Sequence, residues 1–353
     1  MSERGKVKFY NSKKGFGFIE REGKDDVHFR RDSFKGKAPS EGDDVEFDVV
    51  KQTRGPHAKN LKITQRPFYM LPSDTRKIIT SENIDNFALR LNKSPFFDSD
   101  EKFKFFKVDR KKGIVLNVLP DYSKLDIGAI AERHKNSIGE LNISRKSIIL
   151  KPEWRMVIGL GNESVYETSM TLHHIYGIPY IPGSAIKGVI RSHLITEYFE
   201  KNENGQIDLK NAEERALKDQ GFCDIFGCSK NSFYNESRQG RVTFFDAFPL
   251  SEPQVKADVM NPHYGPYYSD SLNKPPADYH NPKPIFFITV ENTEFKFIVG
   301  IYENYDIVIQ EGLFEGKHPL EVTYEYIKKA LSEHGIGAKT AVGYGYMNND
   351  GIK

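Results

Sequence analysis

Five short alternating segments near the N-terminus constrain the fold more than any other feature of this 353-residue sequence. They lie between residues 6 and 63, and each alternates polar and apolar side chains as a half-buried strand does. Turn-forming residues such as Asn11–Lys14 and Arg54–Pro56 separate them. Strands this short leave exposed edges unless their sheet closes on itself. The pattern therefore predicts a closed five-stranded β-barrel over residues 1–65.

Aromatic and basic side chains gather on these predicted strands. Phe16 and Phe18 lie two residues apart and therefore share a face, and Phe9, His28 and Phe29 lie on neighbouring strands. Single-stranded nucleic acid binds such surfaces because each stacked base contributes about 1–3 kcal/mol while cations follow the backbone. The alternative is that the rings fill the barrel core, but glycines on both sides of Phe16 leave that ring room to meet a base. The candidate RNA-binding residues of the barrel are Lys8, Phe9, Lys14, Phe16, Phe18, His28, Phe29 and Arg30.

The distribution of charge supports a polyanionic partner for this region. The net charge of the chain is only +2, yet residues 1–63 hold 15 Lys and Arg against 11 Asp and Glu. Two cysteines in a chain of this length favour a reducing compartment. The sequence shows neither a secretory leader nor an apolar run of transmembrane length. We therefore expect a soluble, cytoplasmic protein with no membrane partner.

Residues 4–63 resemble the cold-shock domain, a small OB-type barrel. Lys14–Ile19, with the sequence KGFGFI, matches the first RNA-binding motif of that family. Val27–Phe29 matches only the end of the second motif, because Asp26 stands where the family usually has an aromatic residue. Phe9 replaces the customary Trp. Both departures remove stacking surface, and Asp26 adds repulsion toward phosphate.

A loop followed by a helix, residues 177–191, is the most informative stretch of the remaining chain. Two prolines and a glycine precede Ser184, which is predicted to cap a helix over residues 185–199. Lys187 and Arg191 lie four apart and so share one helix face near the helix start. The free N–H groups at the helix start, together with these two cations, predict a phosphate-binding site. An ordinary junction with solvated charges is the alternative.

A glycine-rich loop closes the chain. Four glycines fall within residues 335–345, together with Lys339 and Thr340, and exposed N–H groups in such loops can wrap a phosphodiester backbone. A Walker A loop is excluded because Ala338 stands where that motif needs glycine. The candidate RNA-binding residues of this region are Ser184, Lys187, Arg191, Gly335, Gly337, Lys339, Thr340, Gly343 and Gly345.

Residues 80–353 resemble the RAMP superfamily, the RNA-binding subunits of CRISPR effectors, and in particular the capping subunit of the type III-B (Cmr) complex. The resemblance rests on four motifs in order, Ile181–Arg191, Gly240–Ala247, Val259–Tyr264 and Gly335–Gly345. It implies a ferredoxin-like βαββαβ core whose glycine loop and Lys/Arg helix hold guide RNA (crRNA) near its 3′ end. It also implies other Cmr RAMP subunits and target single-stranded RNA as partners, and a non-catalytic role. The cold-shock domain is an addition that this subunit does not ordinarily carry.

The expected fold class is therefore α+β. We expect a cold-shock-like OB barrel at residues 1–65, a linker at 66–79, and a ferredoxin-like RAMP domain at 80–353 with a long loop insertion at 250–284. The sequence leaves open whether that loop contacts RNA or a neighbouring subunit.

Two other functions stay open on the sequence alone. His173 precedes the 177–191 stretch closely enough to act as a general base, which would make the protein a metal-independent endoribonuclease. A free-standing RNA chaperone is the other. Cys223 and Cys228 are a weak zinc signal because no second pair accompanies them, so we expect no metal and no cofactor. For Asp246, at the end of a predicted strand, a structural hydrogen-bonding role is favoured over catalysis.

Overall fold

The computed structural model describes residues 2–21, 23–36, 38–39, 43–52, 55–65, 84–94, 105–109, 113–202, 204–264, 267–268, 275 and 282–348. Its contacts divide the chain into two compact units, residues 1–84 with 90–107 and residues 85–89 with 108–353. The predicted linker at 66–79 lies outside the described residues, as do 265–266, 269–274 and 276–281 of the predicted loop insertion. Among the described residues, none of the helices has the length and hydrophobicity of a transmembrane span.

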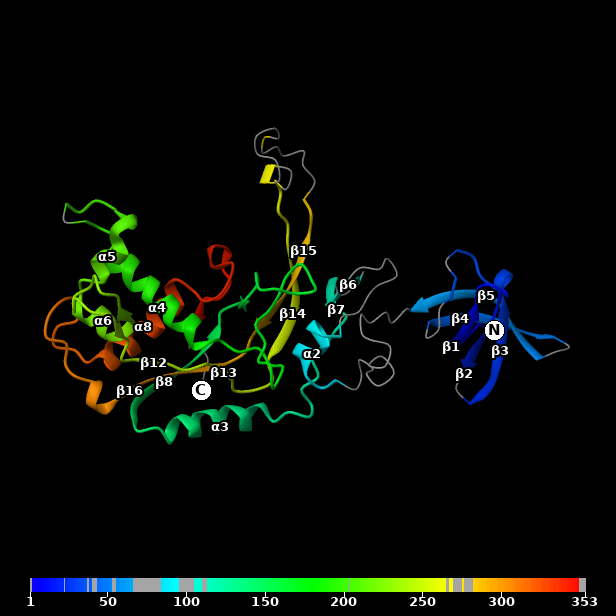
Figure 1. Cartoon of the computed structure of the whole chain (residues 1–353), viewed down its shortest axis with the longest axis horizontal. Helices are drawn as coiled ribbons and strands as arrows, with labels where there is room; N and C mark the ends of the chain where they lie inside the picture. The colour runs from blue at the N-terminus through cyan, green and yellow to red at the C-terminus, as the bar shows by residue number, and fades with distance from the viewer. Residues whose placement is uncertain are drawn as a thin grey trace. The chain divides into compact units, whose positions relative to one another are not determined.

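Five strands form the closed barrel of the first unit (Figure 1, blue). They are β1 (Ser2–Asn11), β2 (Phe16–Arg21), β3 (Lys24–Arg30), β4 (Asp44–Gln52) and β5 (Gly55–Gln65). Their order around the barrel is β1-β2-β3-β5-β4, so every strand has two partners and no edge remains. The inward side chains are the apolar members of the alternating pattern, Val7, Ile19, Val27, Phe29, Val45, Phe47, Ala58 and Leu61. The predicted OB-type barrel is confirmed.

The core of the second unit is an antiparallel sheet backed by two helices. In chain order its elements are β8 (Ile143–Pro152), α4 (Gly183–Tyr198), β12 (Thr243–Phe244) with β13 (Phe248–Pro249), β16 (Phe295–Tyr302), α8 (Pro319–Glu333) and β17 (Met347–Asn348). The sheet order is β12-β16-β8-β17, and β13 also pairs with β16. Counting β12 and β13 as one interrupted strand gives βαββαβ with strand order 2-3-1-4, which is the predicted ferredoxin-like topology.

Helical and strand periodicity place the apolar side chains of this core. Alternate residues of β16, Phe295, Phe297, Val299 and Ile301, are buried almost completely. α4 buries Ile186, Ile190 and Leu194, and α8 buries Tyr326, Ile327, Ala330 and Leu331. The two helices contact one another, and α8 also contacts β8 and β16. A further helix, α3 (Ile127–Gly139), contacts β13.

A second, three-stranded sheet lies beside this core in the chain's larger unit. Its order is β14 (Gln254–Met260), β15 (Ile285–Glu291), β9 (Arg155–Met156). β14 falls inside the segment 250–284 that was predicted to be a loop, and it pairs with β15 along its whole length. That part of the loop prediction is wrong, because the apolar partners that hold these residues in a strand come from β15. Figure 1 shows β14 and β15 as a long pair in yellow and orange.

The remaining elements are short. They are η1 (Arg31–Ser33), α2 (Phe87–Asn92), β6 (Phe106–Asp109), β7 (Gly113–Leu116), η3 (Leu209–Asn211), α5 (Ala212–Ala216), α6 (Gln220–Phe226), β10 (Gly227–Cys228), β11 (Arg238–Gln239), η4 (Glu303–Tyr305) and η5 (Thr340–Val342).

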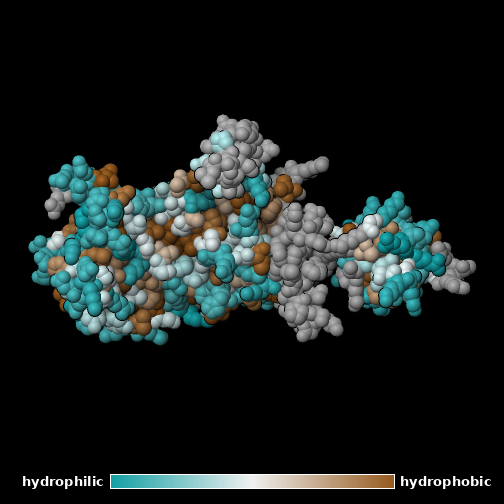
Figure 2. All heavy atoms as spheres, turned by 45° about the horizontal axis from the view of Figure 1, so that its top comes forward, coloured by the Kyte–Doolittle hydropathy of each residue, from teal (hydrophilic) through white to brown (hydrophobic). Residues whose placement is uncertain are grey.

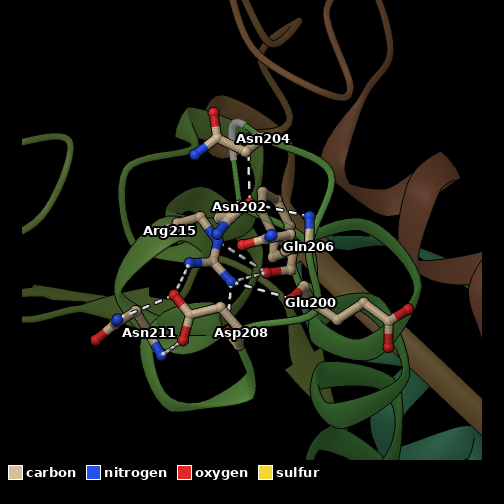
Figure 3. A network of polar contacts seen from close by, with 8 residues as sticks. Glu200, Asn202, Asn204, Gln206, Asp208, Asn211 and Arg215 are labelled. Atoms are coloured by element: carbon tan, nitrogen blue, oxygen red, sulfur yellow. Dashed lines mark hydrogen bonds and ion pairs between the residues drawn. The ribbon is translucent and has the colours of Figure 1, made fainter.

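A polar network fastens the chain that follows α4 (Figure 3). The guanidinium of Arg215 donates to the carbonyl oxygens of Phe199, Glu200 and Asp208 at 2.6–3.2 Å. It also forms an ion pair of 2.9 Å with the Asp208 carboxylate. Asn202 accepts the backbone N–H groups of Asn204 and Gln206. One arginine therefore satisfies carbonyls at the end of α4 that have no helical partner.

Candidate nucleic-acid interfaces

Four aromatic rings of β1, β2 and β3 form one cluster on the barrel. Phe9 lies 5.9 Å from Phe16 and 5.6 Å from Phe18, between ring centroids. His28 lies 5.9 Å from Phe16 and 5.3 Å from Phe18. The strand register explains the contacts, since Phe18 pairs with both Phe9 and His28. Phe9 is 39% exposed and the other three are half-buried, so the cluster offers ring faces at the barrel surface.

The cations predicted around this cluster differ in their availability. Lys14 and Arg30 are exposed, and neither forms an ion pair with a described residue. Lys8 forms an ion pair of 2.9 Å with Asp26, which raises the pKa of the lysine. Asp26, expected to repel phosphate, is thus partly neutralised by Lys8. On the face drawn in Figure 2, hydrophilic residues cover most of the barrel unit.

Phe29 cannot take part in stacking, which corrects its inclusion in the predicted set. Its side chain is fully buried and packs on Tyr10 at 5.5 Å between ring centroids. His28 and Phe29 are consecutive in β3, so they face opposite sides of the strand. The two glycines that flank Phe16 were expected to leave its ring room for a base, but the structure gives them other roles. A Cβ at Gly17 would lie 2.5 Å from the Phe29 ring, and Gly15 has a φ of +68°. Both glycines serve the backbone and the core.

His28 of the aromatic cluster meets a second histidine, His57, and we predict that this pair makes the barrel less stable in acid. The Nδ1 atoms of His28 and His57 lie 3.0 Å apart, which requires at least one neutral ring. Burial, and then repulsion from His57, lowers the pKa of His28, and burial likewise lowers the pKa of His57. The unfolded chain therefore binds protons more readily, so this contribution to stability is present above a pH of about 6.5 and is lost as the pH falls below it.

Amide hydrogen exchange within the barrel measures this effect. Protection, corrected for the intrinsic exchange rate, should fall from pH 7.5 to pH 5, and the fall should be smaller in His57→Gln, which cannot be protonated there. Protection that is the same at both pH values would contradict the assignment.

The start of α4 does not form the phosphate-binding site that the sequence predicted. The helix begins at Gly183 with Pro182 as the N-cap residue, so Ser184 is not the cap. Instead, the backbone N–H of Gly183 donates to Oδ1 of Asp246 at 2.8 Å. Asp246 therefore has the structural role expected of it, and its negative charge occupies the helix terminus. A Cβ at residue 183 would lie 2.1 Å from the carbonyl oxygen of Phe244, which explains the glycine.

The two cations of α4 are not equally accessible. Arg191 forms an ion pair of 2.6 Å with Glu213 and lies over the Phe222 ring. Lys187 is half-buried, and burial followed by repulsion from Arg191 lowers its pKa. Between them, Gly188 is exposed, and a Cβ added there would have no described atom within 4 Å other than its neighbours in the helix. Lys187 and the exposed backbone at Gly188 remain open to a ligand on this helix face.

The glycine loop is anchored at its ends and exposed in its middle. Gly335, Gly337, Gly343 and Gly345 all have positive φ values, and Lys339 is in the left-handed region as well. The N–H of Ala338 donates to the carbonyl of Val157, and the N–H of Gly345 to that of Arg155. Gly335 and Gly345 are buried, whereas Gly337, Ala341, Val342 and Gly343 are exposed.

Lys339 and Thr340 lie between the anchored and exposed parts of this loop, and both are half-buried. The ammonium of Lys339 contacts Sδ of Met260 at 3.6 Å and lies over the Phe287 ring. Lys187 interacts with Arg191, whereas Lys339 contacts Met260. No described contact therefore joins Lys187 to the glycine loop, and these are the two parts of the predicted RNA-binding surface of the RAMP domain.

Trp154 is a candidate residue that the sequence analysis missed. The residue is 51% exposed, and its ring lies 4.8 Å from the ring of Tyr344, which belongs to the glycine loop. The hydroxyl of Tyr344 donates to Asp258, and Asp258 also forms a 2.5 Å ion pair with Arg155. The Trp154 ring therefore packs against Tyr344, whose hydroxyl is held by Asp258, and it lies beside the glycine loop. The signal in the sequence was a solitary tryptophan in a polar context, KPEWRM.

His173 lies among aromatic rings rather than beside a cluster of acids. It stacks on His174 and Tyr176, with centroids 5.2 and 4.8 Å apart, and its Nδ1 accepts the N–H of Tyr176. Burial, followed by repulsion from His174, lowers its pKa. Cys223 and Cys228 are free thiols, and burial raises the pKa of Cys223 to about 12. These environments favour structural roles.

Comparison with known proteins identifies both parts of the chain. Residues 153–348, more than half of the sequence, match the RAMP superfamily. The chain belongs to this superfamily. Residues 3–64 match the 'Cold-shock' DNA-binding domain, and this part is 52% identical over 60 residues to a cold shock-like protein, CspB, of Bacillus cereus, covering 92% of that protein and 16% of this chain. A RAMP domain and a cold-shock domain therefore share one chain.

The RAMP domain is similar to proteins of CRISPR systems. It is 35% identical over 238 residues to the CRISPR system Cmr subunit Cmr6 of Pyrococcus furiosus, an alignment that covers 56% of this chain and 66% of that subunit. A similar subunit of Saccharolobus solfataricus is 26% identical over 257 residues, covering 70% of this chain and 72% of that subunit. The crystal structure of the Pyrococcus furiosus protein aligns with a TM-score of 0.35 at 31% identity, over 59% of this chain and 99% of that one.

Proposed function

We propose that this protein is a non-catalytic, RNA-binding subunit of a type III-B (Cmr) CRISPR effector complex, working in the cytoplasm. The observation that carries the proposal is the 35% identity of the RAMP domain with a subunit of a Cmr system. Guide RNA, target single-stranded RNA and other Cmr RAMP subunits are the proposed partners. The subunit caps the complex where the 3′ end of the guide lies.

The glycine loop is the proposed contact of the RAMP domain with the guide backbone. Val342 and Gly343 donate their N–H groups within the loop, whereas no described hydrogen bond uses the N–H groups of Thr340 and Ala341. Lys339 supplies a cation for which no ion pair with a described residue is found. Trp154 offers a ring on which a base can stack next to that backbone. Lys187, with the open backbone at Gly188, adds a further phosphate contact on α4.

The cold-shock barrel is proposed to hold a second, single-stranded segment of RNA. Phe9, Phe16, Phe18 and His28 provide stacking faces, and Lys14 and Arg30 provide charge. That segment is either the protruding 3′ end of the guide or the incoming target. Two binding units on one chain raise the local concentration of RNA at each unit, because binding at one makes binding at the other intramolecular.

The fluorescence of Trp154 tests the RAMP contact, since this is the only tryptophan in the chain. We expect guide-type RNA to quench its emission. Replacing Lys339 by alanine should weaken this binding at every RNA sequence and reduce the slope of log K against log salt by about 0.7, the value for one phosphate contact with a single strand. Lys317→Ala is the matched control, because Lys317 forms an ion pair with Glu325 on α8. Emission that stays constant at RNA concentrations that saturate the protein would overturn the proposed contact.

A native pull-down followed by RNA sequencing tests the assignment to a complex. Repeat-derived guide RNA with other RAMP subunits supports it, and mixed cellular RNA without partners indicates a free-standing chaperone. The non-catalytic role is tested by incubating RNA with purified protein, with and without EDTA. Intact RNA is expected, and cleavage that disappears in His173→Ala would establish the nuclease instead.

A further inference from the structure

Three potential metal ligands converge between the two helices that back the ferredoxin-like sheet. His193 and Glu197 come from α4, and Glu333 is the last residue of α8. One ligand atom from each lies within 4.8 Å of the other two. His193 Nε2 is 2.8 Å from Oε2 of Glu197 and 3.9 Å from Oε2 of Glu333. Residues four apart share one helix face, so α4 directs both of its ligands toward the end of α8.

His193 is the unusual member of this cluster because it is buried without a hydrogen bond. Only 2% of the residue is exposed, and neither ring nitrogen has a hydrogen-bond partner among the described residues. A buried polar group without a partner costs about 1–3 kcal/mol, and most such groups in native proteins are satisfied by protein, water or an ion. Here Nε2 lies 2.8 Å from Oε2 of Glu197 and 3.9 Å from Oε2 of Glu333, yet it forms a hydrogen bond with neither.

The simplest alternative is a His193 ring that donates its Nε2–H group to Oε2 of Glu197, 2.8 Å away, but this hydrogen bond is not formed in the described geometry. The other oxygen of Glu197, Oε1, already has a cation, because Lys329 forms an ion pair with it. Glu197 therefore keeps Oε2 for a different positive partner.

We propose that His193, Glu197 and Glu333 bind one divalent transition-metal ion, for which Zn²⁺ is the suitable probe. Imidazole and carboxylate ligands suit this class of ion. Ligand atoms about 2.1 Å from a tetrahedral ion lie about 3.4 Å from one another, so the 2.8 and 3.9 Å separations need only small side-chain movements. Water completes the fourth position on the exposed side, where Glu333 lies.

The surroundings of the cluster support a cation at this point. Lys329 on Oε1 of Glu197 orients the carboxylate in the way that outer-shell partners orient metal ligands. Glu333 ends α8, and the carbonyl groups at a helix C-terminus favour positive charge. A bound ion would fasten α4 to α8 and so stiffen the core that supports the glycine loop, without itself touching RNA.

Isothermal titration calorimetry tests this site. ZnCl₂ is titrated into the metal-free protein, which carries both domains and no affinity tag. We expect one high-affinity ion per chain and a rise in the melting temperature of the larger unit of about 5 °C or more at saturating metal. In Glu333→Gln the affinity should fall about 100-fold, and in His193→Gln a comparable loss is expected. Glu333 is exposed, so its variant should fold even if the His193 variant does not.

Glu325→Gln is the matched control on the same helix. Glu325 forms an ion pair with Lys317 and is not one of the three ligands, so this variant should bind Zn²⁺ as the parent does. Equal affinity in Glu333→Gln and Glu325→Gln would overturn the site and would place any bound zinc elsewhere, for example at the His28–His57 pair or at Cys223. Absence of binding at millimolar Zn²⁺ would overturn it as well.

Discussion

Replacing Phe16 and Phe18 together by alanine is expected to weaken the binding of a short single-stranded RNA by the barrel about 100-fold. Each lost stacking contact costs about 1–3 kcal/mol. Both rings are half-buried in the surface cluster with Phe9 and His28, while the barrel core is formed by other side chains, including Phe29. The double variant should therefore keep its fold. Fluorescence anisotropy of a labelled oligonucleotide of about six nucleotides, in the size range of one OB fold, measures the affinity.

Two features of this measurement separate stacking from charge and one unit from the other. The slope of log K against log salt should be the same in the double variant, because no cation is lost, whereas Arg30→Ala should reduce it by about 0.7. Trp154 emission should not change with this oligonucleotide if only the barrel binds it. Unchanged affinity of the double variant across the salt series would show that the barrel does not bind bases, and would favour a protein-docking role.

Gly337→Ala is expected to lower the stability of the RAMP domain by about 3 kcal/mol, a decrease in melting temperature of roughly 6–12 °C. Two costs add. Residue 337 has a φ of +93°, which alone costs an alanine about 1–2 kcal/mol, and its Cβ would lie 2.2 Å from the carbonyl oxygen of Val157. That oxygen accepts the N–H of Ala338, so relieving the clash also breaks the anchor of the loop. RNA quenching of Trp154 should weaken in the same variant.

Gly343→Ala is the control that isolates the clash. Residue 343 has the same φ of +93°, but a Cβ added there would have no described atom within 4 Å apart from its chain neighbours. Only the conformational cost of about 1–2 kcal/mol should remain. Thermal unfolding followed by circular dichroism compares the two variants directly. Equal melting temperatures would mean that Val157 and the loop separate without cost, which the geometry argues against.

Local patterns determined most of the fold. Alternation of side chains over residues 6–63 needs no distant information, because a period of two predicts strands and five short strands close into a barrel. The helix that was predicted at 185–199 occurs at Gly183–Tyr198. The resemblance that the four motifs carry implied the ferredoxin-like topology that the sheet adopts. The same alternation also held the answer for Phe29, since neighbours in one strand cannot share a face.

Tertiary structure decided the environment of each candidate residue. Asp246 lies 63 positions from the start of α4 in the sequence, yet its carboxylate accepts a hydrogen bond there, where phosphate was expected to bind. Glu213 forms an ion pair with Arg191, which was expected to contact phosphate. Trp154 gains its meaning only because the glycine loop folds back beside it. Glu333 meets His193 from a distant part of the chain because α4 and α8 pack together. Periodicity and motif spacing indicate on which face of its helix or strand a residue lies. Ion pairing and burial depend on contacts with segments far away in the sequence, and no local pattern shows which segments those are.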